Sequence, residues 1–309
     1  MSGTEFVQLS LTPMLIGVFV AVACALPGNF LVLRRQALIG DAISHVVLPG
    51  IVVAFLLTGA VSTWPMLIGA AAAAVLAVVA IEAIRRLGKI EPGAAMGVVF
   101  TAMFAAGVLL LEQSDTSSVP LDVEHALYGN LESLIWLDAR GWGSLFDPVA
   151  LSNLPVEFLR MAVTLLGVLL FVAVMWQPLK ISTFDEGFAL TIGMRSRALG
   201  FVLIVVSAIA AVAAFDAVGS IIVIAMFICP PAAARLMTNR LEHQIWWSIL
   251  FAVAAAVFGY VFAGYGPIWL GFESSVSAAG MIATVSGVIL ALTALMGPHK
   301  SRQGAAAGG

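Results

Sequence analysis

The sequence predicts an all-α protein, a bundle of about eight or nine transmembrane helices. Of its 309 residues, 61% are hydrophobic and 10% are charged, and the mean hydropathy is +1.08. Soluble domains carry about 25% charged residues, so these values exclude a large soluble core. The sequence also lacks a GxxxxGK[ST] phosphate-binding loop, which excludes the usual form of ATP hydrolysis by this chain. We therefore expect a single transmembrane domain over residues 1–309.

Nine apolar stretches are each about long enough to cross the hydrocarbon core of a bilayer. They cover residues 11–33, 37–58, 62–83, 93–111, 158–177, 198–215, 218–236, 245–263 and 277–296. With nine spans and an external N-terminus, all of the fourteen Lys and Arg except Arg140 and Arg160 fall on the cytoplasmic side, as the positive-inside rule requires. Eight spans with both termini inside would fit only if one weak segment were re-entrant.

The longest stretch between spans, residues 112–157, is expected to lie outside the cell membrane. It carries eight carboxylates and one arginine. Leu127, Leu131, Leu134 and Ile135 follow helical spacing, which predicts an amphipathic helix at the surface. This stretch is either a solvated loop with one packed helix or a docking surface for an extracytoplasmic partner. At the other end of the chain, residues 301–309 are rich in Gly and Ala and are expected to be disordered.

The segment RRQALIGDAISHVVLPG, residues 34–50, places a carboxylate and an imidazole inside a membrane span. Asp41 and His45 are four residues apart, so they share one helix face. If Arg34 and Arg35 mark the membrane edge, the helical rise puts the two side chains roughly 10 and 16 Å inside a hydrocarbon core about 30 Å thick. Ionisable groups at that depth indicate a pathway for an ion or a proton.

The chemistry of this pair fits a transition metal in transit. Imidazole and carboxylate together suit zinc, manganese and ferrous iron, and two ligands make the weak site that a conduit needs. A self-satisfying structural pair and a proton relay are the alternatives that the residues leave open. Pro49 and Gly50 follow directly and are expected to kink or break the helix, freeing backbone carbonyls.

Three further positions carry weaker predictions. In the cytoplasmic stretch 180–197, Thr183, Asp185 and Glu186 are expected to begin a short helix that Gly193 ends. This helix is either a plain connector or an element that inserts into a cytosolic motor subunit. Asp216 is expected to cap the helix that begins near Val218, or else to lie where a metal enters. The two prolines in FICPPAAAR, residues 227–235, are expected to break the seventh span.

Five segments, in order, resemble the zinc/manganese/iron permease family of ABC importers. They are RRQALIGDAISHVVLPG, IEPGAAMGVVFTAMFAAGVLLL, LDVEHALYGNLESL, LKISTFDEGFALTIGM and FDAVGSIIVIAMFICPPAAARLMT. The similarity runs from about residue 14 to 296. Five ordered matches are more specific than any single motif. The sequence departs from the family pattern at Asp216 and in the second proline of CPPAAA.

This resemblance implies a homodimeric permease of vitamin-importer-like ABC architecture in the cytoplasmic (inner) membrane of a bacterium. ATP would be bound and hydrolysed on a separate cytosolic ATPase subunit, and an extracytoplasmic metal-binding protein would deliver the ion. No permanently bound cofactor and no nucleic-acid partner are expected. The "STFD" run around Asp185 is closer to manganese or iron members than to zinc members. The alternative function is a stand-alone proton-coupled carrier or channel that uses Asp41 and His45 as a relay.

The resemblance also assigns roles to individual positions. Asp41 and His45 match the family positions for the metal in transit. The positions expected to meet the ATPase are Thr183, Phe184, Asp185, Glu186, Ala189 and Gly193. The positions expected to dock the metal-binding protein are Asp122, Glu124 and Tyr128.

Overall fold

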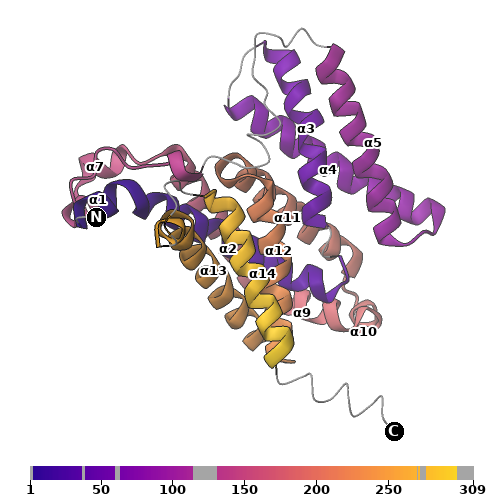
Figure 1. The fold of residues 1–309 in the computed structure, drawn as a ribbon. Coiled ribbons are helices and arrows are strands. Elements are labelled where there is room, and N and C mark those ends of the chain that lie inside the picture. The colour runs from indigo at the N-terminus through magenta and orange to yellow at the C-terminus, as the bar shows by residue number, and fades with distance from the viewer. Residues whose placement is uncertain are drawn as a thin grey trace.

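The structure is a bundle of membrane-spanning helices (Figure 1). It is a computed structural model that describes residues 3–36, 39–59, 63–113, 131–269, 271 and 276–297. Within these residues, nine helical segments are long and apolar enough to cross a membrane. The predicted fold class and the nine spans are therefore confirmed.

The helices follow the predicted order along the chain. The first span begins as α1 (Gly3–Phe6), passes through a π-helical turn (Val7–Leu11) and continues as α2 (Thr12–Leu33). The other spans are α3 (Ile39–Thr58), α4 (Thr63–Gly88), α5 (Pro92–Gln113), α8 (Val156–Val174), α11 (Ser196–Val218), α12 (Ser220–Met237), α13 (Leu241–Trp269) and α14 (Ala278–Met296). Short elements are η2 (Leu131–Ser133), η3 (Trp142–Phe146), α7 (Pro148–Ser152), α9 (Trp176–Phe184) and α10 (Glu186–Thr191).

The spans form two groups. Helices α3, α4 and α5 pack on one another, while α8, α12 and α13 pack on α2, and α14 packs on α12 and α13. Helix α11 contacts members of both groups. Helix α2 is apolar on nearly every side, which is the pattern of a helix buried all round. Its Asn29 is fully buried and accepts a hydrogen bond of 3.0 Å from Gln244 Nε2 of α13.

The prolines of α12 do not break this helix, contrary to the prediction. Pro230 and Pro231 lie inside a continuous helix. Pro231 leaves the Phe227 carbonyl without its helical donor, and α2 approaches that carbonyl so closely at Gly28 that an added Cβ would lie 2.5 Å from it. Neighbouring helices thus cover the freed backbone group, which is the condition for tolerating proline in a membrane helix.

Helix α3 is also continuous through Pro49 and Gly50, so the expected break is absent. Gly50 instead marks the crossing of α3 and α4. A Cβ on Gly50 would lie within 2.3 Å of the Gly69 carbonyl oxygen, and Ala54 and Ala73 continue the small-residue contact. Small residues four apart on both helices allow this backbone approach.

We expect Gly50→Ala to destabilise the α3–α4 crossing, because the added methyl group meets backbone that cannot move aside as a side chain would. Overpacking of this kind costs on the order of 1–3 kcal/mol. The measurement is the midpoint of thermal unfolding of the purified protein in detergent. Gly287→Ala in α14 is the control, because no atom lies within 4 Å of its added Cβ. Equal midpoints for the two variants would contradict the crossing described here.

The described part of the outer stretch does not form the predicted amphipathic α-helix. Residues 131–133 form a 3-10 turn, and the chain after it is irregular. The Trp136 backbone N–H donates to the Gln8 carbonyl at 2.9 Å, and Trp136 Nε1 donates to the Ala150 carbonyl at 2.9 Å. These contacts with distant segments replace the helical hydrogen bonds. They also hold the N-terminal turns, so the first span begins earlier than predicted.

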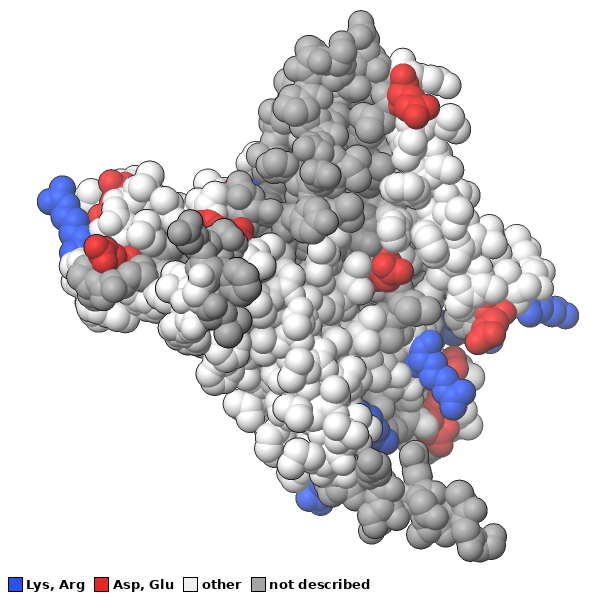
Figure 2. Space-filling view, in the orientation of Figure 1, with Lys and Arg blue, Asp and Glu red and all other residues white. Residues whose placement is uncertain are grey.

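Charged side chains lie mainly at the ends of the bundle. On the face seen in Figure 2 most of the surface is uncharged, and Lys and Arg gather toward the end where α9 and α10 lie. Many large apolar side chains are exposed along the spans, as lipid contact requires. The distribution agrees with a multi-pass membrane protein whose α9–α10 end is cytoplasmic.

Candidate functional site

Asp41 and His45 lie together in the first half of α3, as their spacing predicted. His45 Nε2 is 3.7 Å from Asp41 Oδ1. In this single chain the side chains of His45 and Asp41 are 37% and 39% exposed. The pair therefore lies on the surface of the chain, where a further molecule can reach both groups.

Two aromatic rings of α5 enclose the imidazole. The Phe100 ring is stacked on His45, with centroids 5.2 Å apart and an interplanar angle of 27°. The Phe104 ring meets it edge-on, with centroids 5.6 Å apart and an angle of 85°. Neither residue was predicted from the sequence as part of the site. Their own spacing of four, which repeats that of Asp41 and His45, was the available signal.

One turn further along α3, Pro49 affects the backbone of the same site. Because proline has no N–H, the His45 carbonyl lacks its normal helical donor. Helix α5 approaches Pro49 at Gly107, where an added Cβ would lie 2.9 Å from the proline nitrogen. The crossing of α3 and α5 thus includes an imidazole, a carboxylate and a backbone carbonyl without an α-helical partner.

The pair alone is an incomplete metal site. Among the residues that the structure describes, no group of three or more His, Cys, Asp and Glu side chains could hold a metal ion. Structural zinc sites take four protein ligands. An imidazole and a carboxylate can hold a borderline divalent cation only briefly, unless a second molecule adds ligands.

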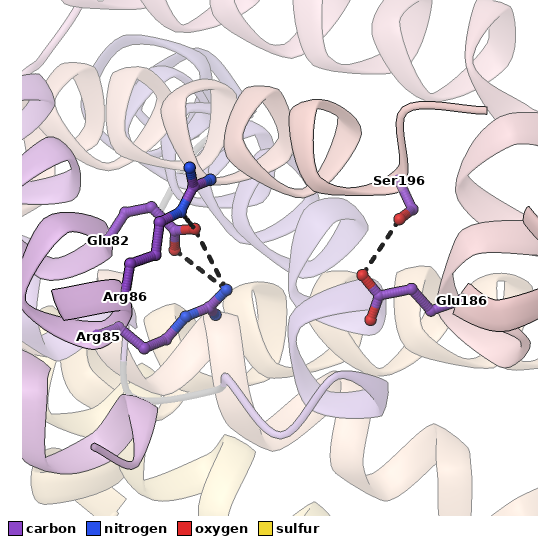
Figure 3. A network of polar contacts seen from close by, with 5 residues as sticks. All are labelled: Glu82, Arg85, Arg86, Glu186 and Ser196. Atoms are coloured by element: carbon purple, nitrogen blue, oxygen red, sulfur yellow. Dashed lines mark hydrogen bonds and ion pairs between the residues drawn. The ribbon is translucent and has the colours of Figure 1, made fainter. Parts of the chain in front are cut away.

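A separate cavity of about 430 Å³ opens at the α9–α10 end of the bundle. Its charged lining residues are Arg34, Glu82, Arg85, Glu186 and Arg197. In Figure 3, Glu82 and its arginines project from α4 on one side, while the Glu186–Ser196 pair lies on the other. The cavity therefore separates the α3–α5 group from the segment that holds α10.

The Asp41–His45 pair does not line this cavity. Ala42 and Val46 of α3 line it, whereas the His45 ring packs on Phe100 and Phe104 of α5. Helix α3 therefore uses two faces differently, with small and apolar residues toward the cavity and the Asp41–His45 pair on the face that meets the aromatic rings of α5.

The cytoplasmic segment forms the short helix that the sequence predicted. The Asp185 side chain caps α10 by accepting a hydrogen bond of 2.8 Å from the Phe188 backbone N–H. Gly193, with φ of 76°, follows the helix. Phe184 and Phe188 are about half exposed, while Ala189 is buried. The helix thus presents apolar side chains outward at the cytoplasmic end.

Arg34 connects this segment to the helix that precedes the metal pair. Its Nε donates to Thr183 Oγ1 at 3.0 Å and its Nη2 donates to Ser182 Oγ at 2.8 Å. Burial lowers the pKa of the Arg34 guanidinium, and the Glu186 carboxylate partly offsets this. The sequence analysis treated Arg34 only as a marker of the membrane edge, because its partners lie about 150 residues away along the chain.

The other predicted positions lie on α11 or outside the described residues. Asp216 lies within the last turn of α11, and Gly219, with φ of 77°, precedes α12. The residue directly before α12 is thus Gly219 and not Asp216. Asp122, Glu124 and Tyr128 lie outside the described residues, as does the stretch 301–309.

The chain is similar to known membrane transport proteins over nearly its whole length. Residues 6–138 and 149–297 match the ABC 3 transport family. The chain is 39% identical, over 91% of its length and 90% of the relative, to the manganese transport system membrane protein MntD of Bacillus subtilis. It is 37% identical to the zinc transport system membrane protein TroD of Treponema pallidum, over 94% of this chain and 74% of TroD. The solved structure of PsaBC from Streptococcus pneumoniae in complex with Fab matches with a TM-score of 0.72 and 26% identity, covering 93% of this chain and 91% of that one.

Proposed function

This chain belongs to the ABC 3 transport family, as the permease subunit of a metal importer in a bacterial cytoplasmic membrane, and from this premise we propose that its cargo passes Asp41 and His45. The observation that carries the proposal is the geometry of this pair. An imidazole and a carboxylate lie 3.7 Å apart on one face of a membrane-spanning helix, and more than a third of each side chain is exposed. Ionisable groups placed in this way mark ion pathways in membrane proteins.

Two copies of the chain would complete the site. Each copy contributes one imidazole and one carboxylate, so a homodimer that joins the α3–α5 edges supplies four side-chain ligands. Four ligands approach the coordination that zinc and similar cations accept. The exposure of the pair in the single chain supports this arrangement, because the edge that carries the ligands is open to a partner.

The cargo is manganese or iron before zinc. MntD is named for manganese and TroD for zinc, so both metals lie within the range of similar proteins. Imidazole with carboxylate accepts any of the three metals. Two ligands per chain therefore discriminate weakly, and the protein that delivers the ion would supply most of the selectivity.

Transport needs partners on both sides of the membrane. A cytosolic ATPase would contact α9 and α10, where Phe184, Phe188 and Ile192 are exposed, and would bind the ATP. An extracytoplasmic metal-binding protein would dock near Asp122, Glu124 and Tyr128, and Asp216 would lie where the ion enters. This permease itself catalyses no reaction and binds no permanent cofactor.

Reconstitution in lipid vesicles tests this assignment. We expect vesicles that contain the chain with its ATPase and the loaded metal-binding protein to accumulate radioactive manganese only when ATP is supplied. Vesicles with the chain alone should accumulate none, with or without a proton gradient. Metal flux through the chain alone would favour the stand-alone carrier, an alternative that membership of an ABC family already disfavours.

A further inference from the structure

We propose that Phe100 and Phe104 of α5 are positioning residues for the His45 imidazole, an inference that rests on the proposed transit of metal past Asp41 and His45. Phe100 covers one face of the imidazole at a centroid distance of 5.2 Å. Phe104 presents its ring at nearly a right angle, at 5.6 Å. Offset-stacked and edge-to-face arrangements at these distances are the favourable geometries for ring pairs.

Within the described part of the chain, these two rings are the close contacts that orient the imidazole. A metal-ligating histidine usually donates its second ring N–H to a carboxylate, a carbonyl or water. Among the described residues, the polar partner of His45 is Asp41, at 3.7 Å from Nε2, which is longer than a hydrogen bond. Ring packing therefore takes the place of the usual hydrogen bond in holding the imidazole.

The register of α5 against α3 places both rings. Phe100 and Phe104 are four residues apart on α5, as Asp41 and His45 are on α3, so each pair shares one helix face. One turn further, Gly107 allows the α5 backbone to approach Pro49 closely. A bulkier residue at 107 would separate the two helices, so the Gly107–Pro49 contact and the aromatic contacts belong to one interface.

The rings act on affinity rather than on the number of ligands. An imidazole that can rotate about its side-chain bonds loses this rotational entropy when the ion binds. That loss weakens binding. Phe100 and Phe104 remove this rotational freedom beforehand and leave Nε2 of the ring beside Asp41, 3.7 Å from its Oδ1. Groups that hold a ligand in orientation typically change metal affinity by 10- to 100-fold when they are hydrogen bonds, and we expect a smaller effect from ring packing.

The test measures how uptake depends on manganese concentration in the complete transporter, with the ATPase and the delivery protein. For Phe100→Leu we expect a three- to tenfold higher half-saturating concentration of manganese and a maximal rate within about twofold of the parent. Phe104→Leu should show a smaller rise, because it loses only the edge-on contact. Phe100→Tyr keeps the stacked ring and should restore the parent value.

A matched aromatic pair elsewhere in the bundle provides the control. Phe258 and Phe262 of α13 are also four residues apart, with stacked rings 6.3 Å apart. Phe258→Leu removes a comparable contact far along the chain from α3 and should leave the half-saturating concentration unchanged. That concentration does not depend on how much transporter reaches the membrane, so reduced expression of a variant leaves the comparison intact.

The outcomes separate this inference from the function on which it rests. An unchanged half-saturating concentration in Phe100→Leu, together with loss of uptake in His45→Ala, overturns the positioning role and leaves the transit site standing. An equal rise in Phe258→Leu, or no rescue by Phe100→Tyr, also overturns the positioning role. Unchanged uptake in His45→Ala removes the transit site itself.

Discussion

Replacing His45 with alanine is expected to lower manganese uptake by the assembled transporter at least tenfold at limiting metal. In the proposed site the imidazole would supply one of the two ligands from each chain, and it lies 3.7 Å from the other, the Asp41 carboxylate. Loss of a group that merely orients a metal ligand commonly costs 10- to 100-fold in affinity, and loss of the ligand itself should cost no less. Asp41→Asn should have a comparable effect, because it keeps the shape of the side chain and removes its charge. The measurement is the initial rate of radioactive manganese uptake by cells at equal amounts of membrane protein.

His243 provides the matched control for the histidine substitution. It lies near the start of α13, where its side chain is exposed. His243→Ala removes an equal side chain away from the proposed path and should leave the uptake rate unchanged. If His45→Ala transported as fast as His243→Ala, the pair would have no part in carrying the ion, and a structural Asp–His contact would be the remaining interpretation.

The sequence predicted the spans well because the bilayer imposes one strong constraint. Every backbone polar group in the hydrocarbon core must be satisfied within a helix or a closed barrel, so long apolar stretches could be assigned as helices directly. Helix α10 was predicted for a local reason as well, since Asp185 and Gly193 are signals for the start and the end of a helix. Both successes depend on residues that are neighbours along the chain.

The wrong predictions concern residues whose environment comes from distant segments. Pro231 was expected to break α12, yet Gly28 of α2 brings backbone against the carbonyl that this proline frees. The amphipathic spacing was expected to continue a helix through Leu134 and Ile135, yet the described chain after Ser133 is irregular, and Trp136 donates hydrogen bonds to Gln8 and Ala150. Local rules could not foresee either partner.

The candidate site shows the same division. The spacing of Asp41 and His45 placed both on one face of a helix, and the structure confirms that they are adjacent. The packing of α3 against α4, α5 and α11 determines which neighbours this face meets. No sequence pattern within α3 predicts those neighbours. The Phe100 contact required the register between α3 and α5, which only the folded chain defines.

Arg34→Met is expected to separate ATP hydrolysis from metal uptake. The Arg34 guanidinium donates to Ser182 and Thr183, at the end of the helix that leads into α10. The same residue follows α2 directly and precedes Asp41 by seven positions. Arg34 thus connects the cytoplasmic segment proposed to meet the ATPase with the chain that enters the metal-binding helix. Methionine keeps most of the apolar stem and removes every donor.

The size of the effect follows from the contacts that are lost. A hydrogen bond to a charged group contributes about 1.5–3 kcal/mol. Losing two of them should weaken the connection enough to reduce uptake by at least about tenfold. We expect the ATPase rate of the purified complex to stay within about threefold of the parent, because the proposed nucleotide site lies on another subunit. Both rates are measured on the same reconstituted vesicles.

Two further variants decide whether the connection itself is responsible. Arg35→Met alters the adjacent, exposed arginine and should change neither rate. The double variant Ser182→Ala and Thr183→Val removes the acceptors while keeping Arg34, and it should reproduce the loss of uptake with retained hydrolysis. The single variant Ser182→Ala leaves the Thr183 acceptor in place, so it should lower uptake less than the double variant does. Ser182 also donates to the Pro178 carbonyl at 2.7 Å, a bond that both variants remove. A parallel fall of hydrolysis and uptake in Arg34→Met would instead show that the guanidinium holds the fold or the complex together, because a broken connection lowers uptake alone.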